Sequence, residues 1–241
     1  NAMKTRCLGA VAVYVATGGH LEVSVDGGPW QERRIVALPA YVPHRLRTPD
    51  GRIATVCLEP ETVDREDLGA LLSHVNDGPE DERLIRRILT ARREVTRIRD
   101  AGGFSTGEFD RYFLRRTLRP REVDARIRHI LDRLLDELPE ATISAGECAG
   151  DVGLSTSRFL HLFKENTDVA FRTQRMWKRA RRFMDHANRD ESLTDVALDL
   201  GYPDSSHFSH SIRASFGLKP RSIRAGSRGM QVCIGENYVL S

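Results

Sequence analysis

The sequence predicts an α+β protein with a small N-terminal antiparallel β-barrel, a helical connector and an all-α C-terminal domain that contains two helix-turn-helix units. Three observations predict this fold. Short runs of Val, Ile, Leu and Tyr are cut by glycine-rich turns before residue 64, helical spacing of apolar residues follows, and one helix-and-turn pattern occurs twice after residue 140. At 241 residues the chain is long enough for one large domain or two modest ones.

The composition is that of a soluble globular protein. Hydrophobic residues make up 40% of the chain and charged residues 29%, and no apolar run approaches the roughly 20 residues of a membrane-spanning helix. The cysteines form no Cys-x-x-Cys pair, so neither a disulfide framework nor a structural zinc site is predicted. We therefore expect a cytoplasmic protein without membrane contact, metal or other cofactor. The four cysteines are Cys7, Cys57, Cys148 and Cys233.

The N-terminal domain is predicted over residues 3–64, since Asn1-Ala2 ahead of Met3 is typical of a tag remnant. Asp26-Gly27 is the strongest hairpin signal in the chain. The stretch from Cys7 to Ala16 has the composition of a short secretory signal, but it continues into strand-like sequence, which favours a buried first strand. Turns at such short intervals indicate a small antiparallel barrel or sandwich.

A helical connector is predicted over residues 65–119, where Leu and Ile recur at helical spacing, as in Leu84–Leu89. These apolar rows offer a surface for a homodimer, or alternatively they pack within one chain. Arg119-Pro120 marks the boundary to a C-terminal domain over residues 120–225, and residues 226–241 form a C-terminal tail.

The C-terminal domain contains the pattern of helix, tight glycine turn and helix twice. In the first copy, Ser144–Glu147 has the form of a capping box, Gly153 supplies the turn and Ser155 caps the next helix. In the second copy, Ser192–Asp195 has capping form, and an apolar stripe at helical spacing leads to Gly201. The sequence therefore predicts two helix-turn-helix units.

The second helix of each unit, here called the reading helix, repeats after a shift of 49 residues. In the first reading helix Ser157, His161 and Lys164 share the outer face, which suits a major groove. An internal repeat has far fewer alternative explanations than a single helix-turn-helix pattern. The matched residues are Phe159 with Phe208, Phe163 with Ile212, Lys164 with Arg213 and Val169 with Leu218.

The positive charge is concentrated in the same domain. The formal net charge is +3, and residues 142–225 hold 13 Lys and Arg against 10 Asp and Glu. Residues 170–184 contain basic but no acidic side chains, a density that suits contacts with DNA phosphates. The predicted phosphate-contacting residues are Lys164, Arg175, Arg179, Arg182 and Arg213.

The segments Gly153–Lys164 and Val196–Ser209, closed by Gly217–Pro220, resemble the DNA-binding domain of the AraC/XylS family of transcription regulators, and the match covers residues 121–225. The resemblance implies seven helices, with the reading helices in successive major grooves on one DNA face, about 34 Å apart. By position it also implies the base-facing residues. These are Ser157, Leu160 and His161 in the first reading helix and Ser205, Ser206, His207 and His210 in the second.

Some positions depart from the family pattern. Asp168 and Phe171 stand where the family has Gly and Pro, which predicts an altered turn after the first unit. Leu160 contacts a thymine methyl or, alternatively, packs on a neighbouring element. Few base-facing residues are Arg or Gln, so shape and backbone contacts are expected to contribute more. His207 and His210 lack a third ligand at suitable spacing, so no metal site is expected there.

Residues 7–64 resemble the small cupin-like effector domain of many family members, through Val36–His44. A catalytic metal cupin needs several His and Glu ligands, whereas only His20, Glu22 and His44 are present, without a His-x-His pair, so no enzyme activity is expected. Four side chains are candidates for an effector pocket, with ordinary core and hairpin packing as the alternative. They are Tyr14, Trp30, Tyr41 and His44.

The predicted function is a sequence-specific DNA-binding transcription regulator that responds to a small-molecule effector in its barrel. One alternative is a constitutive DNA-binding regulator whose barrel binds a protein partner. Another is a cupin enzyme fused to a DNA-binding tail, which predicts about one equivalent of metal. The expected partners are double-stranded operator DNA, the effector, a second copy in a homodimer, and RNA polymerase if the protein is an activator.

Overall fold

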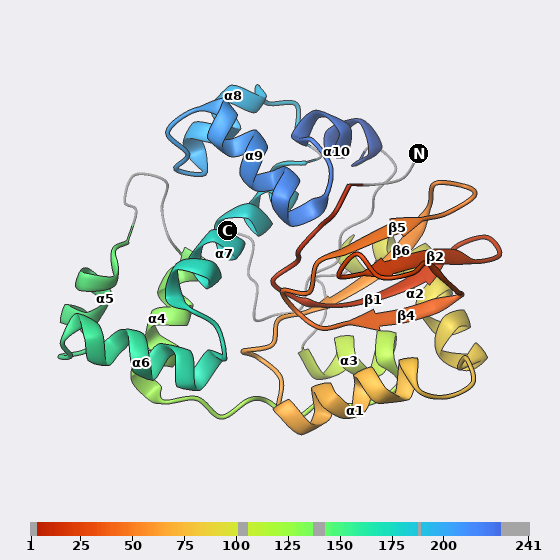
Figure 1. The fold of residues 1–241 in the computed structure, drawn as a ribbon, viewed down its shortest axis with the longest axis horizontal. Coiled ribbons are helices and arrows are strands. Elements are labelled where there is room, and N and C mark those ends of the chain that lie inside the picture. The colour runs from red at the N-terminus through yellow and green to blue at the C-terminus, as the bar shows by residue number, and fades with distance from the viewer. Residues whose placement is uncertain (1–3, 101–105, 137–142, 188, 228–241) are drawn as a thin grey trace. The chain divides into compact units, whose positions relative to one another are not determined.

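The computed structural model describes residues 4–100, 106–136, 143–187 and 189–227 (Figure 1). The chain divides into two compact units, of which the first ends at Arg121 and the second begins at Glu122. Along the described ranges, no helix is both long and apolar enough to cross a membrane. The elements of the first unit are β1 (Val11–Ala16), β2 (Leu21–Val25), β3 (Gln31–Arg33), β4 (Ile35–Leu38), β5 (His44–Arg47), β6 (Ile53–Leu58), α1 (Arg65–Asn76), α2 (Glu82–Asp100) and α3 (Thr106–Leu114).

The strands of the first unit form two antiparallel three-stranded sheets, ordered β4-β1-β6 and β3-β2-β5. The hairpin predicted at Asp26-Gly27 is confirmed, because both residues have positive φ, 48° and 74°, and they lead from β2 toward β3. Antiparallel pairing is thus confirmed. The predicted closed barrel is wrong for the described residues, because no ladder of paired strands joins the two sheets.

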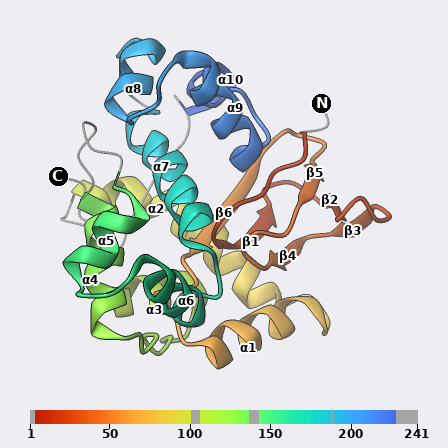
Figure 2. The same cartoon turned by 60° about the vertical axis from the view of Figure 1, so that its left-hand side comes forward.

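The helices after residue 64 share a core with the β4-β1-β6 sheet. Val13 and Val15 of β1 are fully buried together with Leu71 of α1 and Ile85 and Ile88 of α2. Figures 1 and 2 show α1 beside this sheet. The rows of Leu and Ile therefore pack within the chain, one of the two predicted alternatives, and residues 65–119 lie in the same compact unit as the strands instead of forming a separate connector.

A cluster of charged side chains binds the end of the first unit to the start of α1. The Arg119 guanidinium lies 2.7 Å from Asp64, 3.0 Å from Glu66 and 2.9 Å from Asp67, all at the start of α1. Hydrogen bonds from Arg119 hold the pKa of the Asp67 carboxyl below its ordinary value. Arg121 extends the contact, since its N–H donates to the carbonyl of Thr62 at 3.2 Å. These bonds fix the segment that leaves the first unit.

The second unit is all-helical in its described residues. The first part of its core joins Ile127 and Ile130 of α4 to Cys148 of α5 and Phe159 and Phe163 of α6. The seven helices that the family resemblance implies are present. They are α4 (Ala125–Asp136), α5 (Ala145–Asp151), α6 (Thr156–Thr167), α7 (Phe171–His186), α8 (Leu193–Asp199), α9 (Ser205–Phe216) and α10 (Pro220–Ser227).

Candidate DNA-binding surface

The first helix-turn-helix unit consists of α5, a tight turn and α6. The capping box is confirmed, because the Ser144 hydroxyl accepts the N–H of Glu147 at 3.1 Å and the Glu147 carboxylate accepts the N–H of Ser144 at 2.7 Å. Gly153 takes the left-handed conformation, with φ of 66°. The N–H of Leu154 then donates to the carbonyl of Ala149 at 2.8 Å, which closes the turn before α6.

The second helix-turn-helix repeats this geometry with α8 and α9. Ser192 caps α8 by accepting the N–H of Thr194 at 3.1 Å. Gly201 has φ of 69°, and the N–H of Tyr202 donates to the carbonyl of Ala197 at 2.9 Å. The turn glycines and their closing hydrogen bonds therefore correspond in the two copies, as the repeated sequence pattern predicts.

The reading helices α6 and α9 also end alike. Asp168 and Gly217, 49 residues apart, have φ of 63° and 72°, and their N–H groups donate to Lys164 and Arg213 carbonyls at 2.9 Å each. The altered turn predicted from Asp168 and Phe171 is not found. Asp tolerates the left-handed region better than most residues, and the buried Phe171 starts α7 against the core.

This cap provides a stability test. Asp168→Gly is expected to raise the free energy of unfolding by about 1 kcal/mol, because glycine adopts positive φ without steric cost and removes a negative charge from a helix C-terminus. Urea unfolding followed by circular dichroism measures the change. Asp132→Gly, at an exposed position inside α4, is the matched control and is expected to be destabilising. A variant at position 168 less stable than the wild type would contradict the strain assigned to Asp168.

Aromatic side chains pack on the buried faces of both reading helices. Phe159 and Phe163 of α6 contact Phe171, with ring centroids 5.2 and 5.3 Å away. In α9, Phe208 lies 5.2 Å from Phe183 of α7 and 5.3 Å from Tyr202. Each reading helix therefore buries one face on α7 or its N-terminal turn and leaves the opposite face to solvent.

The predicted base-facing residues lie on these solvent-exposed faces. In α6, Leu160 is 40% exposed, and His161 is exposed beside Glu165, 3.6 Å from its carboxylate. The exposure of Leu160 shows that it does not pack into the core of this unit. The other predicted readers are all exposed as well, namely Ser157 in α6 and Ser205, Ser206, His207 and His210 in α9.

The predicted phosphate contacts divide into two groups. Lys164 is exposed and Arg213 is half-buried, each in the last turn of its reading helix. By contrast, the guanidinium groups of three α7 residues donate to backbone carbonyls inside the domain. Arg175 donates to Ile143, Arg179 to Gly201 and Arg182 to Leu135. These three residues therefore hold the domain together, a role that the density of basic residues does not predict.

Lys178 is the clearest departure from the predicted basic helix. It is 4% exposed and lies one turn after the buried Gln174. Burial, and secondly the charge of Arg181, lowers the pKa of its amine well below the ordinary value. The inclusion of Lys178 in a phosphate-binding run is therefore wrong, because helical periodicity turns this position toward the protein interior.

Two further arginines are exposed, of which Arg172 belongs to the predicted basic run 170–184 and Arg158 was not predicted to contact DNA. Arg158 lies in the first turn of α6, at the position that corresponds to His207, and Arg172 lies in the first turn of α7. The 49-residue shift could have identified Arg158 as a candidate, because it matches Arg158 of α6 with His207 of α9, which is a predicted base-facing residue. Arg158 and Arg172 are therefore added to the candidate DNA-contacting residues.

In the first unit, the structure brings together only part of the candidate effector pocket. The Tyr14 hydroxyl lies 2.8 Å from Nε2 of His44, and Nδ1 of His44 lies 2.8 Å from the carbonyl of Val42. Because a carbonyl only accepts, Nδ1 carries the hydrogen and the Tyr14 hydroxyl donates to Nε2. Both side chains are buried, at 0% and 2% exposure. Tyr41 is half-buried, and burial followed by the charge of Glu61 raises its pKa.

Trp30 lies apart from this pair. Its ring stacks against the guanidinium groups of Arg45 at 5.1 Å and Arg47 at 3.8 Å. These arginines alternate along β5 with the buried His44 and Leu46, so they point to the opposite face of the strand. The four candidate residues therefore do not line one pocket. Of the described residues, no three His, Cys, Asp or Glu side chains are arranged to hold a metal ion.

The buried His44 predicts an acid-sensitive fold. Burial lowers the pKa of His44 from 6.5 to about 4. Between these pH values the unfolded chain takes up a proton on His44 that the folded chain excludes. The contribution of His44 to the free energy of unfolding is therefore complete above pH 6.5 and is lost as the pH falls toward 4. Urea unfolding measures the free energy of unfolding at about pH 7 and about pH 4.5. The decrease between these two pH values is expected to be about 2–3 kcal/mol smaller in His44→Gln than in the wild type. Equal losses in both proteins would contradict a buried neutral His44.

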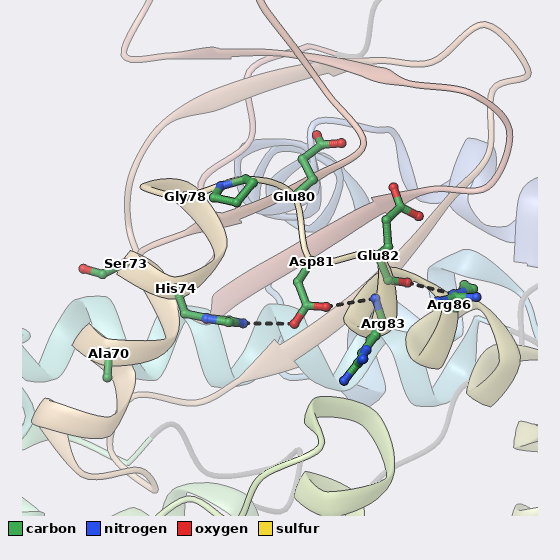
Figure 3. Close-up of a pocket in the computed structure, with 10 residues that line it drawn as sticks. Ala70, Ser73, His74, Gly78, Glu80, Asp81, Glu82, Arg83 and Arg86 are labelled. Carbon is green, nitrogen blue, oxygen red and sulfur yellow. Dashed lines mark hydrogen bonds and ion pairs between the residues drawn. The ribbon is translucent and has the colours of Figure 1, made fainter.

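Figure 3 shows an open depression elsewhere in the first unit, between the end of α1 and the start of α2. His74 Nε2 lies 3.2 Å from Asp81, whose other oxygen accepts the N–H groups of Arg83 and Leu84 at the start of α2. These bonds lower the pKa of the Asp81 carboxyl. His74 and Asp81 are therefore engaged with each other and with the start of α2.

Comparisons with known proteins agree with this geometry. Residues 148–226 match the model of a helix-turn-helix domain family. The transcriptional activator RhaS of Escherichia fergusonii is 35% identical over 108 residues, which cover 43% of this chain and 37% of RhaS. The bifunctional transcriptional activator and DNA repair enzyme Ada of Escherichia coli is 29% identical over 100 residues, 42% of this chain and 28% of Ada. The chain thus spans about a third of the length of these relatives.

A solved structure of ToxT from Vibrio cholerae superposes with a TM-score of 0.54, covering 93% of this chain and 97% of ToxT at 12% identity, which shows similarity of fold. Two glycine-turn units, each with an exposed reading helix and joined through α7, define a double helix-turn-helix domain. In this domain, the chain is similar to transcription regulators of the AraC/XylS family.

Proposed function

We propose that the chain is a sequence-specific DNA-binding transcription regulator. The observation that carries this proposal is the repeat of one helix-turn-helix geometry, in which α6 and α9 each follow a left-handed glycine turn, begin at a side-chain N-cap and expose polar residues. Helix-turn-helix proteins insert the N-terminal part of such a helix into the major groove. Two copies in one chain read two successive grooves.

The proposed contacts follow from exposure. The predicted readers of α6 and α9 contact base edges, while Lys164 and Arg213 contact phosphates at the other ends of the helices. Serine and histidine contacts discriminate bases less strongly than bidentate arginines, so the shape of the DNA adds to the specificity.

Selection of bound duplexes from a random pool by the full chain tests the proposal. We expect a site with two preferred segments, and His210→Ala is expected to weaken binding to that site roughly 5- to 10-fold while leaving binding to unrelated DNA nearly unchanged. His20, which lies between β1 and β2 of the first unit, offers a matched control through His20→Ala. Failure to enrich any sequence would contradict the proposal.

The first unit is proposed to bind a small-molecule effector that shifts the affinity of the second unit for DNA. This proposal rests on the resemblance of residues 7–64 to an effector domain, and the buried Tyr14–His44 pair, which joins β1 to β5, is the polar feature nearest to such a role. The alternative is a protein partner for this unit. A thermal-shift screen discriminates the two, since a small-molecule ligand raises the unfolding temperature and a unit that binds only protein gives no such response.

Because the RhaS relatives are described as transcriptional activators, the proposed role includes contact with RNA polymerase. A homodimer is also proposed, although the buried Leu and Ile rows of α1 and α2 do not supply its surface. Sedimentation of the full chain with and without selected DNA measures the stoichiometry.

A further inference from the structure

The Asp204 carboxylate determines which nitrogen of His207 carries hydrogen. One carboxylate oxygen accepts the backbone N–H groups of Ser206 and His207, each at 2.8 Å, and the other lies 2.8 Å from Nδ1 of His207. The hydrogen bonds, foremost that of the His207 backbone, lower the pKa of the Asp204 carboxyl. An ionised carboxylate only accepts, so the hydrogen between the two groups belongs to Nδ1. In the neutral ring, Nε2 is therefore a hydrogen-bond acceptor.

This acceptor faces solvent at the start of the second reading helix. The His207 side chain is 70% exposed, and Nε2 has no hydrogen-bond partner among the residues that the structure describes. His207 lies in the first turn of α9, the part of a reading helix that approaches base edges. The ring is thus held by one nitrogen and presents the other outward.

The first helix-turn-helix shows that a reading helix can be capped without a bond from the N-cap side chain to the side chain three residues later. The corresponding N-cap, Ser155, accepts a single N–H, that of Arg158 at 3.3 Å. Shifted by 49 residues, Ser155 and Arg158 become Asp204 and His207. Arg158 can only donate, whereas neutral His207 accepts through Nε2. The two reading helices therefore present opposite hydrogen-bonding character at corresponding positions.

We propose that His207, oriented by Asp204, reads an exocyclic amino group in the major groove, N6 of adenine or N4 of cytosine. This inference rests on the proposed DNA-binding function. Phosphate oxygens carry no donor for an acceptor nitrogen, and guanine and thymine present only acceptors in the major groove. His207 is then a specificity-determining residue, and Asp204 is the positioning residue that fixes its tautomer.

The first test removes the amino group. Selection with the full chain identifies the preferred site, and His207→Ala identifies the base pair whose preference is lost. Adenine is then replaced by purine, or cytosine by 2-pyrimidinone, either of which lacks the amino group. The wild type is expected to bind the altered site roughly 3- to 10-fold more weakly, the effect of one hydrogen bond, whereas His207→Ala is expected to bind both sites equally.

The second test reverses the tautomer. In Asp204→Asn, the side-chain oxygen caps the backbone and the amide NH₂ faces Nδ1, which moves the hydrogen to Nε2 and makes it a donor. The selected base is expected to change to guanine or thymine. Asn and Ser are both good N-caps, so Asp204→Ser is the matched control that keeps the cap but loses the fixed tautomer and with it the preference. Thermal unfolding confirms that each variant folds.

The outcomes separate the two proposals. If the wild type enriches no sequence, both the proposed DNA-binding function and the proposed role of His207 are wrong. If a site is enriched but His207→Ala weakens all sequences equally, or Asp204→Asn selects the same base, the role of His207 is wrong while DNA binding stands.

Discussion

Phe208→Ala is expected to lower the free energy of unfolding of the second unit by about 3–5 kcal/mol, the cost of truncating a fully buried phenylalanine. Phe208 is 1% exposed and holds α9 through its contacts with Phe183 and Tyr202. Because the reading surface of α9 depends on this packing, DNA affinity is expected to fall with stability. Guanidinium unfolding followed by circular dichroism measures the first effect, and fluorescence anisotropy with selected DNA measures the second.

Two further variants complete this experiment. Phe159→Ala is the corresponding change in α6 of the first helix-turn-helix and is expected to cost a similar amount, since Phe159 is fully buried. Leu198→Ala removes an apolar side chain that is 55% exposed and is expected to change stability by less than about 0.5 kcal/mol. A loss below about 1 kcal/mol for Phe208→Ala would contradict the assigned core.

The double variant Lys164→Ala with Arg213→Ala is expected to weaken DNA binding by roughly 10- to 100-fold at physiological salt, similarly for specific and unrelated sequences. Both residues lie in the last turns of the reading helices, where we propose that they contact phosphates. Each lost phosphate contact lowers the slope of log affinity against log salt by about 0.9, so the slope is expected to fall by about 2. Anisotropy titrations over a range of salt concentrations provide the measurement.

Arg33→Ala is the matched control for the salt series, because Arg33 is an exposed basic residue on β3 of the first unit. It removes one positive charge without touching either reading helix. Its salt slope is expected to match that of the wild type. A double variant with an unchanged slope would show that Lys164 and Arg213 do not contact phosphates.

The repeated domain could be predicted from the sequence because its signals are local. Capping residues such as Ser144, glycines at positive φ such as Gly153 and Gly201, and the apolar spacing of the reading helices each act within a few residues. The Asp26-Gly27 hairpin was predictable for the same reason. Where the chain needs an unusual conformation, the residues themselves indicate it.

The features that the sequence did not predict depend on tertiary contacts. The density of basic residues does not distinguish Lys178, which is buried, from the exposed Arg172 on the same helix, because burial is decided by what packs against each face. Arg179 looks like a phosphate ligand until its bond to the Gly201 carbonyl is seen. Likewise, strand runs indicate pairing but not closure, and the two sheets here are separate.

The central claim is that α6 and α9 read two different segments of one DNA site. Random-pool selection with His161→Ala in α6 and, separately, with His210→Ala in α9 tests it most directly. The account predicts that each variant loses base preference in its own segment, with the two segments centred about one helical turn, roughly 10 base pairs, apart. Loss of preference at the same positions in both variants, or at none, would contradict it.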